Sequence, residues 1–229
     1  MRRIGLLGGM SWESTALYYS LLNEGIRERL GGLHSADLVL VSVDFAEIER
    51  LQTAGEWDRA GEILAAEAQR LESAGAECVV LCTNTMHKVA DRVSRDLRIP
   101  LLHLGDVTAA AALDAGMGTV ALLGTRFTMR ESFYRDRLEA AGLRVLVPDP
   151  DAQASLNEII YGELVLGVVR EESRAVYRSA IDELVARGAE GVILGCTEIE
   201  LLVRPEDSPV PTLPTTALHA AAAIDFALA

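Results

Sequence analysis

The chain has 229 residues, half of them hydrophobic, which is enough for a sizeable core in one large or two small domains and too apolar for a disordered chain. Its 21 basic and 34 acidic residues give a formal net charge of −13, so nucleic acids and anionic membranes are not expected partners. No stretch approaches the ~20 apolar residues of a membrane span, and the first apolar run is too short for a signal peptide. The composition predicts a soluble, cytoplasmic protein.

The cysteines and histidines lack the spacing of a disulfide framework or a metal site. The three cysteines are odd in number and include no CxxC pair, which indicates free thiols in a reducing compartment. The four histidines include no HxH or HxxxH pair, so no metal site is expected. These residues are Cys78, Cys82, Cys196, His34, His87, His103 and His219.

Short apolar runs alternate with longer segments of helical period along the chain, which is the pattern of a parallel α/β sheet. The expected strands are Ile4–Leu7, Leu38–Val43, Cys78–Leu81, Leu101–His103, Thr119–Leu123, Val145–Val147 and Val192–Leu194. The expected helices lie at about Ser14–Arg29, Glu56–Ser73, Lys88–Arg95, Val107–Ala115, Arg130–Ala140, Gln153–Leu166, Ser173–Ala186 and Thr215–Ala227.

Two segments repeat in the same order along the chain. Ile4–Gly8 resembles Val120–Gly124 at an offset of 116 residues, and Gly75–Leu81 resembles Gly188–Leu194 at an offset of 113. Although any two α/β halves look somewhat alike, two similar offsets favour two like halves with a cleft between them. Ligands of such sheets bind beyond the carboxyl ends of the strands, so the residues after each strand are the candidate site. The expected domains are residues 1–100 plus 211–229 and residues 101–210.

The segment Gly8–Ser14 follows the first strand and opens the first helix. A glycine pair lets backbone amides approach a ligand, and a helix N-terminus favours a carboxylate or phosphate. Neither a GxGxxG fingerprint nor a Walker lysine is present. The simpler alternative is a tight turn in which Ser11 or Ser14 caps the helix.

Cys82–His87 follows the third strand, and Gly195–Glu198 follows its counterpart in the repeat. In both segments a nucleophilic side chain stands among small polar residues where a helix begins, a position expected to lower a thiol pKa from ~8.5. Cys78 lies inside a strand and is expected to be a core residue. The repeat favours a function for Cys196 more than for Cys82.

Three further side chains could reach the cleft. His87 beside a thiol would make a Cys–His hydrolase, although a lone histidine is more often a satisfied structural residue. Asp44, at a strand end, and Gln52 could contact a ligand. The simpler interpretations are helix capping for Asp44 and a solvated helix face for Gln52.

Four motifs together resemble one known family. They are Ile4–Thr15 (IGLLGGMSWEST), Leu81–Lys88 (LCTNTMHK), Ala121–Thr125 (ALLGT) and Gly195–Glu198 (GCTE). Over essentially its whole length the chain resembles the cofactor-independent aspartate/glutamate racemases, and most of all the L-aspartate/glutamate-specific or broad-specificity bacterial amino-acid racemases. The resemblance implies two pseudo-symmetric α/β domains around an active-site cleft, frequent homodimers, an amino-acid substrate and no cofactor.

The resemblance also implies a two-base mechanism, in which groups on opposite faces of the substrate remove and return the α-proton. Two like halves can supply one such group each, and preorganised amides and hydroxyls stabilise the carbanion in place of a cofactor. The catalytic candidates are Cys196 with Thr83 or Cys82. The substrate-binding candidates are Met10, Ser11, Gln52, Asn84, Thr85, Thr197 and Glu198.

The first cysteine motif departs from the family pattern. It usually reads Cys-Asn-Thr, whereas Cys82–Thr85 carries an additional threonine, so that alignment on Asn-Thr puts Thr83 in the catalytic position. The internal repeat agrees, because the offset of 113 maps Thr83 onto Cys196 and Cys82 onto Gly195. The competing interpretation is that Cys82 turns into the cleft through a shifted loop.

Two further departures concern the substrate side chain. Val165 and Pro214 stand where aspartate-acting members often carry a lysine and an aspartate, which leaves recognition of a side-chain carboxylate open. We predict an amino-acid racemase acting on aspartate or glutamate. The rival functions are decarboxylation or cis–trans isomerisation of a dicarboxylate on a related fold, and non-catalytic binding of a small carboxylate, which Thr83 keeps open.

Overall fold

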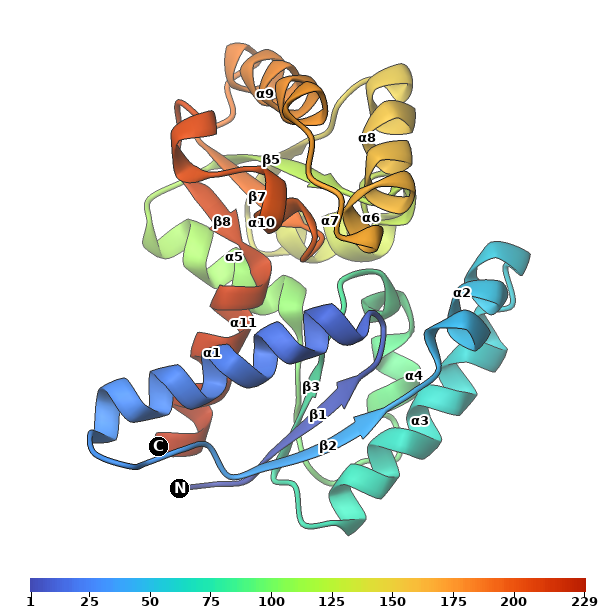
Figure 1. The fold of residues 1–229 in the computed structure, drawn as a ribbon, viewed down its shortest axis with the longest axis vertical. Helices are drawn as coiled ribbons and strands as arrows, with labels where there is room; N and C mark the ends of the chain where they lie inside the picture. Colours follow the sequence, from blue (N-terminus) through green and yellow to red (C-terminus); the bar gives the residue numbers. More distant parts are fainter. The chain divides into compact units, whose positions relative to one another are not determined.

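The computed structural model describes residues 1–229 and divides them into two compact units. Unit 1 comprises residues 1–104 and 219–229, and unit 2 comprises residues 105–218. The boundaries expected from the sequence lie at 100/101 and 210/211. Each unit contains a four-stranded parallel sheet with helices packed on it (Figure 1). The predicted fold class, two like α/β halves, is confirmed.

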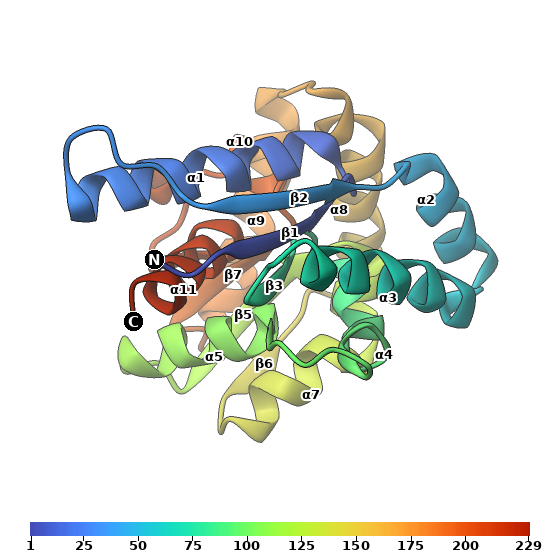
Figure 2. The ribbon, with the colours of Figure 1, turned by 90° about the horizontal axis from the view of Figure 1, so that it is seen from below.

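The sheet of unit 1 lies between two layers of helices (Figure 2). Its strands, in the spatial order β2-β1-β3-β4, are β1 (Ile4–Gly8), β2 (Leu38–Ser42), β3 (Cys78–Leu81) and β4 (Leu101–Leu102). Its helices are α1 (Trp12–Leu30), α2 (Phe45–Ala54), α3 (Trp57–Ser73), the 3-10 turn η1 (Thr85–Val89), α4 (Ala90–Ser94), the start of α5 (Leu104–Asp114) and most of α11 (Thr215–Leu228). α1 and α11 cover one face of the sheet, and α2, α3 and α4 cover the other.

Unit 2 repeats the same strand order. Its strands, in the spatial order β6-β5-β7-β8, are β5 (Thr119–Gly124), β6 (Arg144–Leu146), β7 (Gly191–Gly195) and β8 (Thr212–Pro214). Its helices are α6 (Arg126–Arg130), α7 (Ser132–Ala140), α8 (Pro150–Gly162), η2 (Leu164–Leu166), α9 (Glu171–Ala186), α10 (Ile199–Leu202), η3 (Pro205–Asp207) and the remainder of α5. Leu156 of α8 and Tyr177 and Ile181 of α9 fill the core on one face of the sheet.

The strands and helices expected from the sequence are present, with ends displaced by a few residues. Five short elements were not predicted: α2, α6, α10, η3 and β8. α2 mixes polar and apolar residues, and it begins at Asp44, whose carboxylate accepts from the N–H of Ala46 at 3.1 Å. The capping interpretation of Asp44 is therefore confirmed. β8 has three residues, too few to show a period-2 pattern.

The sheet registers of the two units match the repeat found in the sequence. In unit 1, Leu7 of β1 pairs with Leu81 of β3. In unit 2, Leu123 of β5 pairs with Leu194 of β7. The two pairs are related by the same offsets, 116 and 113, that relate the repeated segments. Position for position, β1 therefore corresponds to β5, and β3 to β7.

Candidate active site

The residues that follow β3 and β7 occupy equivalent positions in the two units. Because the registers match, Thr83 corresponds to Cys196, and Cys82 corresponds to Gly195. Side chains alternate between the two faces of a strand, and Leu194 and Cys196 accordingly lie in one core cluster. Thr83 stands two residues after Leu81, as Cys196 stands two residues after Leu194.

Cys196 lies at the carboxyl end of β7, with 8% of its surface exposed. Its Sγ donates to Oε2 of Glu198 at 3.0 Å, and Oγ1 of Thr197 donates to the same oxygen at 2.7 Å. Burial, reinforced by the adjacent Glu198, raises the pKa of the Cys196 thiol well above its usual range. The expectation that the pKa of Cys196 is lowered is therefore wrong. Burial beside a carboxylate raises this pKa by more than the dipole of the four-residue helix α10 can lower it.

Glu198 is placed to exchange a proton with the thiol. A carboxylate oxygen within hydrogen-bond distance of an S–H group can accept its proton, and the resulting thiolate is the basic form of cysteine. Cys196, Thr197 and Glu198 are all buried, which limits competition from water for these hydrogen bonds. The end of β7 therefore carries a thiol and carboxylate pair suited to general acid–base chemistry.

Cys82 lies on the opposite face of its strand from Leu81. It is fully buried in the core cluster beneath α1 and α11, and its Sγ donates to the carbonyl of Val80 at 3.6 Å. Burial raises the pKa of the Cys82 thiol far above its usual range. Cys78 is likewise buried in β3, as expected, and burial raises its pKa to about 12.

Thr83 follows Cys82 in a loop whose backbone is held on both sides. The N–H of Thr83 donates to the carbonyl of Leu81 at 2.8 Å, and the Thr83 carbonyl accepts from Nδ1 of His87 at 2.7 Å. Thr83, Asn84 and Thr85 are between 5 and 8% exposed, whereas the residues of β3 are fully buried. These three polar side chains thus form the slightly exposed end of a buried strand.

Gln52 approaches this loop from α2. Its side chain is buried, and its Nε2 donates to Sδ of Met86, in η1, at 2.9 Å. A solvated helix face is therefore the wrong interpretation for Gln52, because α2 turns this residue and Leu51 towards the sheet. Gln52 thus lies beside the segment that follows β3, and its contact with a ligand stays a prediction.

The glycine loop after β1 is explained by packing within unit 1. Gly9 has a φ of +91°, and a Cβ at this residue would lie 2.3 Å from the carbonyl oxygen of Val43. The N–H of Gly9 donates to Oγ1 of Thr15 at 2.8 Å, and Ser11 caps α1 by accepting from the N–H of Ser14 at 3.3 Å. The loop is therefore a capped tight turn, whose Met10 side chain is buried in the core, and contacts of Met10 and Ser11 with a substrate stay a prediction.

The two positions that depart from the family pattern are both apolar elements of unit 2. Val165, in η2, packs against the core cluster that contains Cys196. Pro214 ends β8 and pairs with Leu194 of β7, two residues before Cys196. Neither position offers a charge to a substrate carboxylate.

Three of the four histidines come together in unit 1, which their spacing in the sequence did not reveal. The ring centroids of His87 and His103 are 4.7 Å apart, and those of His87 and His219 are 5.8 Å apart. Both ring nitrogens of His87 bond to backbone groups rather than to a thiol. The chain contains no group of three or more histidine, cysteine, aspartate or glutamate residues suited to hold a metal ion.

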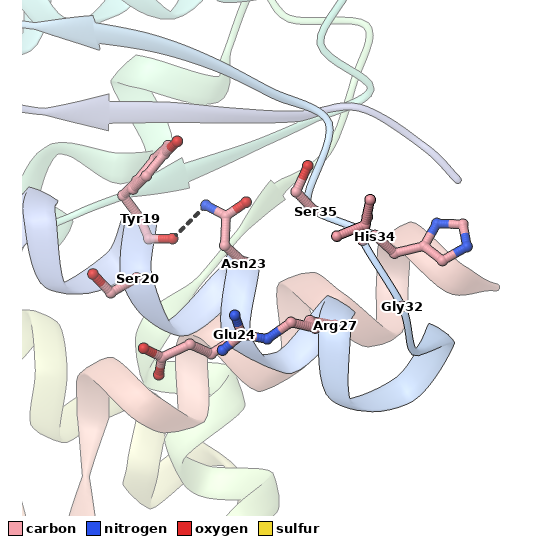
Figure 3. A pocket seen from close by; sticks show the side chains of 9 residues that line it. Tyr19, Ser20, Asn23, Glu24, Arg27, Gly32, His34 and Ser35 are labelled. Atoms are coloured by element: carbon pink, nitrogen blue, oxygen red, sulfur yellow. Dashed lines mark hydrogen bonds between the residues drawn. The ribbon is translucent and has the colours of Figure 1, made fainter.

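Two open grooves in the structure are lined by other residues. One, with a volume of about 450 Å³, lies along α1 and the following loop, where Tyr19, Asn23 and His34 line it (Figure 3). The other lies on α8 and includes Glu158 and Arg170. None of the candidate site residues lines either groove. None of the helices is long and apolar enough to cross a membrane.

The chain thus has two parallel α/β units, with candidate acid/base residues after equivalent strands. A family of known proteins matches it over nearly the whole of its length. The family model for Asp/Glu/Hydantoin racemases matches residues 7–223. The chain therefore belongs to the Asp/Glu/Hydantoin racemase family. The family predicted from the sequence motifs is confirmed, and with it the enzyme class, an isomerase of the racemase type.

Individual relatives agree with this assignment. A protein of the Asp/Glu racemase group from Yersinia pestis has a crystal structure with 51% identity and a TM-score of 0.95, covering 100% of both chains. An aspartate racemase homologue from Pyrococcus horikoshii OT3 is 35% identical, with a TM-score of 0.88 and full coverage of both chains. The broad specificity amino-acid racemase RacX of Bacillus subtilis strain 168 is 24% identical over 162 residues, which are 71% of this chain and 70% of RacX.

Proposed function

We propose that this protein is a cofactor-independent racemase that inverts the α-carbon of aspartate or glutamate by two-base proton transfer. The observation that carries the proposal is the matched register of the two sheets, which gives Thr83 and Cys196 the same position in two like units. Inversion requires one proton-transferring group on each face of a planar intermediate. Two equivalent positions in two like units supply such a pair.

In the proposed reaction, Glu198 takes the proton of the Cys196 thiol, and the thiolate then removes the α-proton of the substrate. The C–H electron pair remains on the α-carbon as a carbanion, and the hydroxyl of Thr83 protonates it on the opposite face. Exchange with solvent returns a proton to the Thr83 oxygen and removes one from Glu198, so no proton is consumed. The amides and hydroxyls of the two loops, including those of Asn84 and Thr197, stabilise the developing charge.

Thr83 is preferred to Cys82 as the second acid/base. Cys82 is fully buried among apolar side chains, whereas Thr83 lies at the slightly exposed strand end. An alcohol has a pKa many units above that of a thiol, so the two half-reactions use unequal bases. Because racemisation has an equilibrium constant of one, kcat/KM is equal in both directions. The unequal strength of the two bases instead appears in deuterated solvent. The enantiomer whose α-proton faces Cys196 exchanges that proton with solvent without being inverted.

The proposal of aspartate or glutamate as substrate is supported by the family to which the chain belongs and by the racemases that it resembles. A second candidate substrate set is a broader range of amino acids, which is favoured by the apolar Val165 and Pro214 near Cys196. We also propose a cytoplasmic homodimer without metal or pyridoxal phosphate, on the basis of the family resemblance. Sedimentation velocity at several protein concentrations tests the dimer.

A screen of all L- and D-amino acids in deuterated buffer, without added pyridoxal phosphate or metal, tests the proposed function. We expect deuterium at the α-carbon and inversion for aspartate, glutamate or both, and a loss of at least ~100-fold in Cys196→Ser, the scale of a removed general acid/base. Release of carbon dioxide would instead indicate a decarboxylase. Thermal stabilisation by a carboxylate without exchange would indicate a binding protein.

A further inference from the structure

A cluster of buried aromatic and imidazole side chains lies behind the Thr83 loop, entirely within unit 1. His87, His103, His219 and Tyr18 are all buried. Their rings meet edge to face, with interplanar angles of 74° for His87 and His103, and 82° for Tyr18 and His219. The proposed reaction uses none of these residues. Their hydrogen bonds nevertheless connect the cluster to Thr83.

The hydrogen bonds of His87 define which of its ring nitrogens carries the proton. Nδ1 lies 2.7 Å from the carbonyl oxygen of Thr83, and because a carbonyl only accepts, Nδ1 must donate. Nε2 lies 3.2 Å from the backbone N–H of Leu104, which only donates, so Nε2 must accept. His87 is therefore neutral, with its proton on Nδ1.

His219 carries its proton on the other nitrogen. Its Nε2 lies 2.8 Å from the carbonyl oxygen of Leu102 and must donate, so in the neutral ring Nδ1 accepts from the hydroxyl of Tyr18 at 2.9 Å. Burial lowers the pKa of His219 to about 4, which keeps this ring neutral. A neutral neighbour imposes no charge on His87, and each imidazole retains the tautomer that its backbone partners require.

His87 holds the Thr83 loop at two consecutive peptide groups. Its Nδ1–H binds the carbonyl of Thr83, and its own backbone N–H donates to the carbonyl of Asn84 at 3.1 Å. The Thr83 N–H is bound to Leu81, so both peptide groups that flank the Thr83 side chain have fixed orientations. The direction of the Thr83 hydroxyl therefore depends on the bond from Nδ1 of His87.

We propose that His87, as the Nδ1–H tautomer, is the positioning residue for the Thr83 half of the reaction. This inference rests on the proposed function, since Thr83 is assigned there as the second acid/base. His87 touches no reacting atom. It aims the Thr83 hydroxyl at the α-carbon, and it leaves the Cys196 half of the reaction unaffected.

Two substitutions separate the two hydrogen bonds of His87. In His87→Asn, the amide nitrogen can replace Nδ1 and keep the hydrogen bond to the Thr83 carbonyl, but the hydrogen bond from the Leu104 N–H to Nε2 is lost. In His87→Gln, the amide oxygen can replace Nε2 and keep the hydrogen bond from the Leu104 N–H, but the hydrogen bond from Nδ1 to the Thr83 carbonyl is lost. Each variant removes one hydrogen bond to a buried backbone group, so the structural disturbance is comparable. His34→Gln, at an exposed histidine, is the control.

The readout is the ratio of inversion to α-deuteration without inversion, measured in deuterated buffer with the enantiomer that exchanges faster. This ratio does not depend on the amount of folded enzyme. We expect His87→Gln to lower the ratio at least ~10-fold, since a small misplacement of a reacting group can cost up to 10²-fold. His87→Asn should stay within about 3-fold of the wild-type ratio. A parallel loss of both reactions in the two variants, or an equal loss of the ratio, would overturn the proposal.

A second measurement does not depend on catalysis. Long-range ¹⁵N–¹H correlation spectra of the protein labelled at its imidazole nitrogens distinguish the two neutral tautomers from each other and from the charged ring. We expect a proton on Nδ1 of His87 and on Nε2 of His219 at pH 7. A proton on Nε2 of His87 would refute the positioning role. Absence of exchange with every amino acid, together with the expected tautomers, would instead refute the proposed racemase function.

Discussion

Replacement of Glu198 by glutamine tests the proton path at Cys196. In the native site, one oxygen of Glu198 accepts from both the Cys196 thiol at 3.0 Å and the Thr197 hydroxyl at 2.7 Å. Glutamine preserves the length and hydrogen-bonding capacity of this side chain, but its amide oxygen does not take up the thiol proton. We expect kcat to fall at least ~100-fold, the lower range for a removed general acid/base, which corresponds to about 2.7 kcal/mol in the barrier.

The same substitution has the opposite effect on the ionisation of the thiol. The charge of Glu198 contributes to the raised pKa of Cys196, second to burial, so its removal should lower that pKa. Alkylation of Cys196, followed by mass spectrometry over a range of pH, should therefore show its midpoint at lower pH in Glu198→Gln.

Slower turnover with a more readily ionised thiol is the signature of a lost proton acceptor. Glu206→Gln, at an exposed glutamate, is the matched control and should change neither value. Normal turnover in Glu198→Gln, or a thiol that ionises at higher pH, would refute this account of the Cys196 site.

The remaining predictions concern Thr83 and two buried titratable groups. Thr83→Cys should raise the ratio of inversion to exchange without inversion. Cys82→Ala should leave that ratio unchanged and lower the free energy of unfolding by ~1 kcal/mol in chemical denaturation. If Cys82→Ala alone abolished inversion, Cys82 would be the second base. Burial raises the pKa of Glu200 from 4.5 to about 7. The native state therefore favours the protonated form, and the protein loses stability as pH rises through 7. Glu200→Gln should accordingly stabilise the protein by up to ~3 kcal/mol at pH 8 and by little at pH 4.5. Burial lowers the pKa of His219 from 6.5 to about 4, so unfolded chains bind more protons in this range and stability falls by up to ~3 kcal/mol between pH 6.5 and 4. His219→Gln, which can still donate to Leu102, should show a shallower fall, and an identical pH dependence would contradict this assignment.

The sequence predicted the central geometric relation of the site because that relation is local and periodic. Offsets of 116 and 113 between like segments became the matched pairs Leu7–Leu81 and Leu123–Leu194. Since a strand has a strict period of two residues, a repeat that fixes the register also fixes which residues share a face. Thr83, two residues after Leu81, and Cys196, two residues after Leu194, correspond through the same offset of 113.

The features that the sequence did not reveal depend on tertiary packing. Gln52 was not recognisable as buried, because its environment is created when α2 docks against Met86. His87 and His219 are 132 positions apart in the chain, and only the packing of α11 onto unit 1 brings their rings together. The pKa of Cys196 was expected to be lowered, because the local pattern shows the start of a helix but neither its shortness nor the burial of the thiol.

The most direct test of the two-base mechanism is a single turnover of one unlabelled enantiomer in deuterated buffer, with both enantiomers separated and analysed by mass spectrometry. If Cys196 removes the proton and Thr83 delivers another from the opposite face, the inverted product carries solvent deuterium at its α-carbon from the first turnover. The recovered substrate should also acquire deuterium, from exchange on the Cys196 side. An inverted product that retains the original proton would show that one group performs both transfers, and would contradict the assignment of one acid/base to each unit.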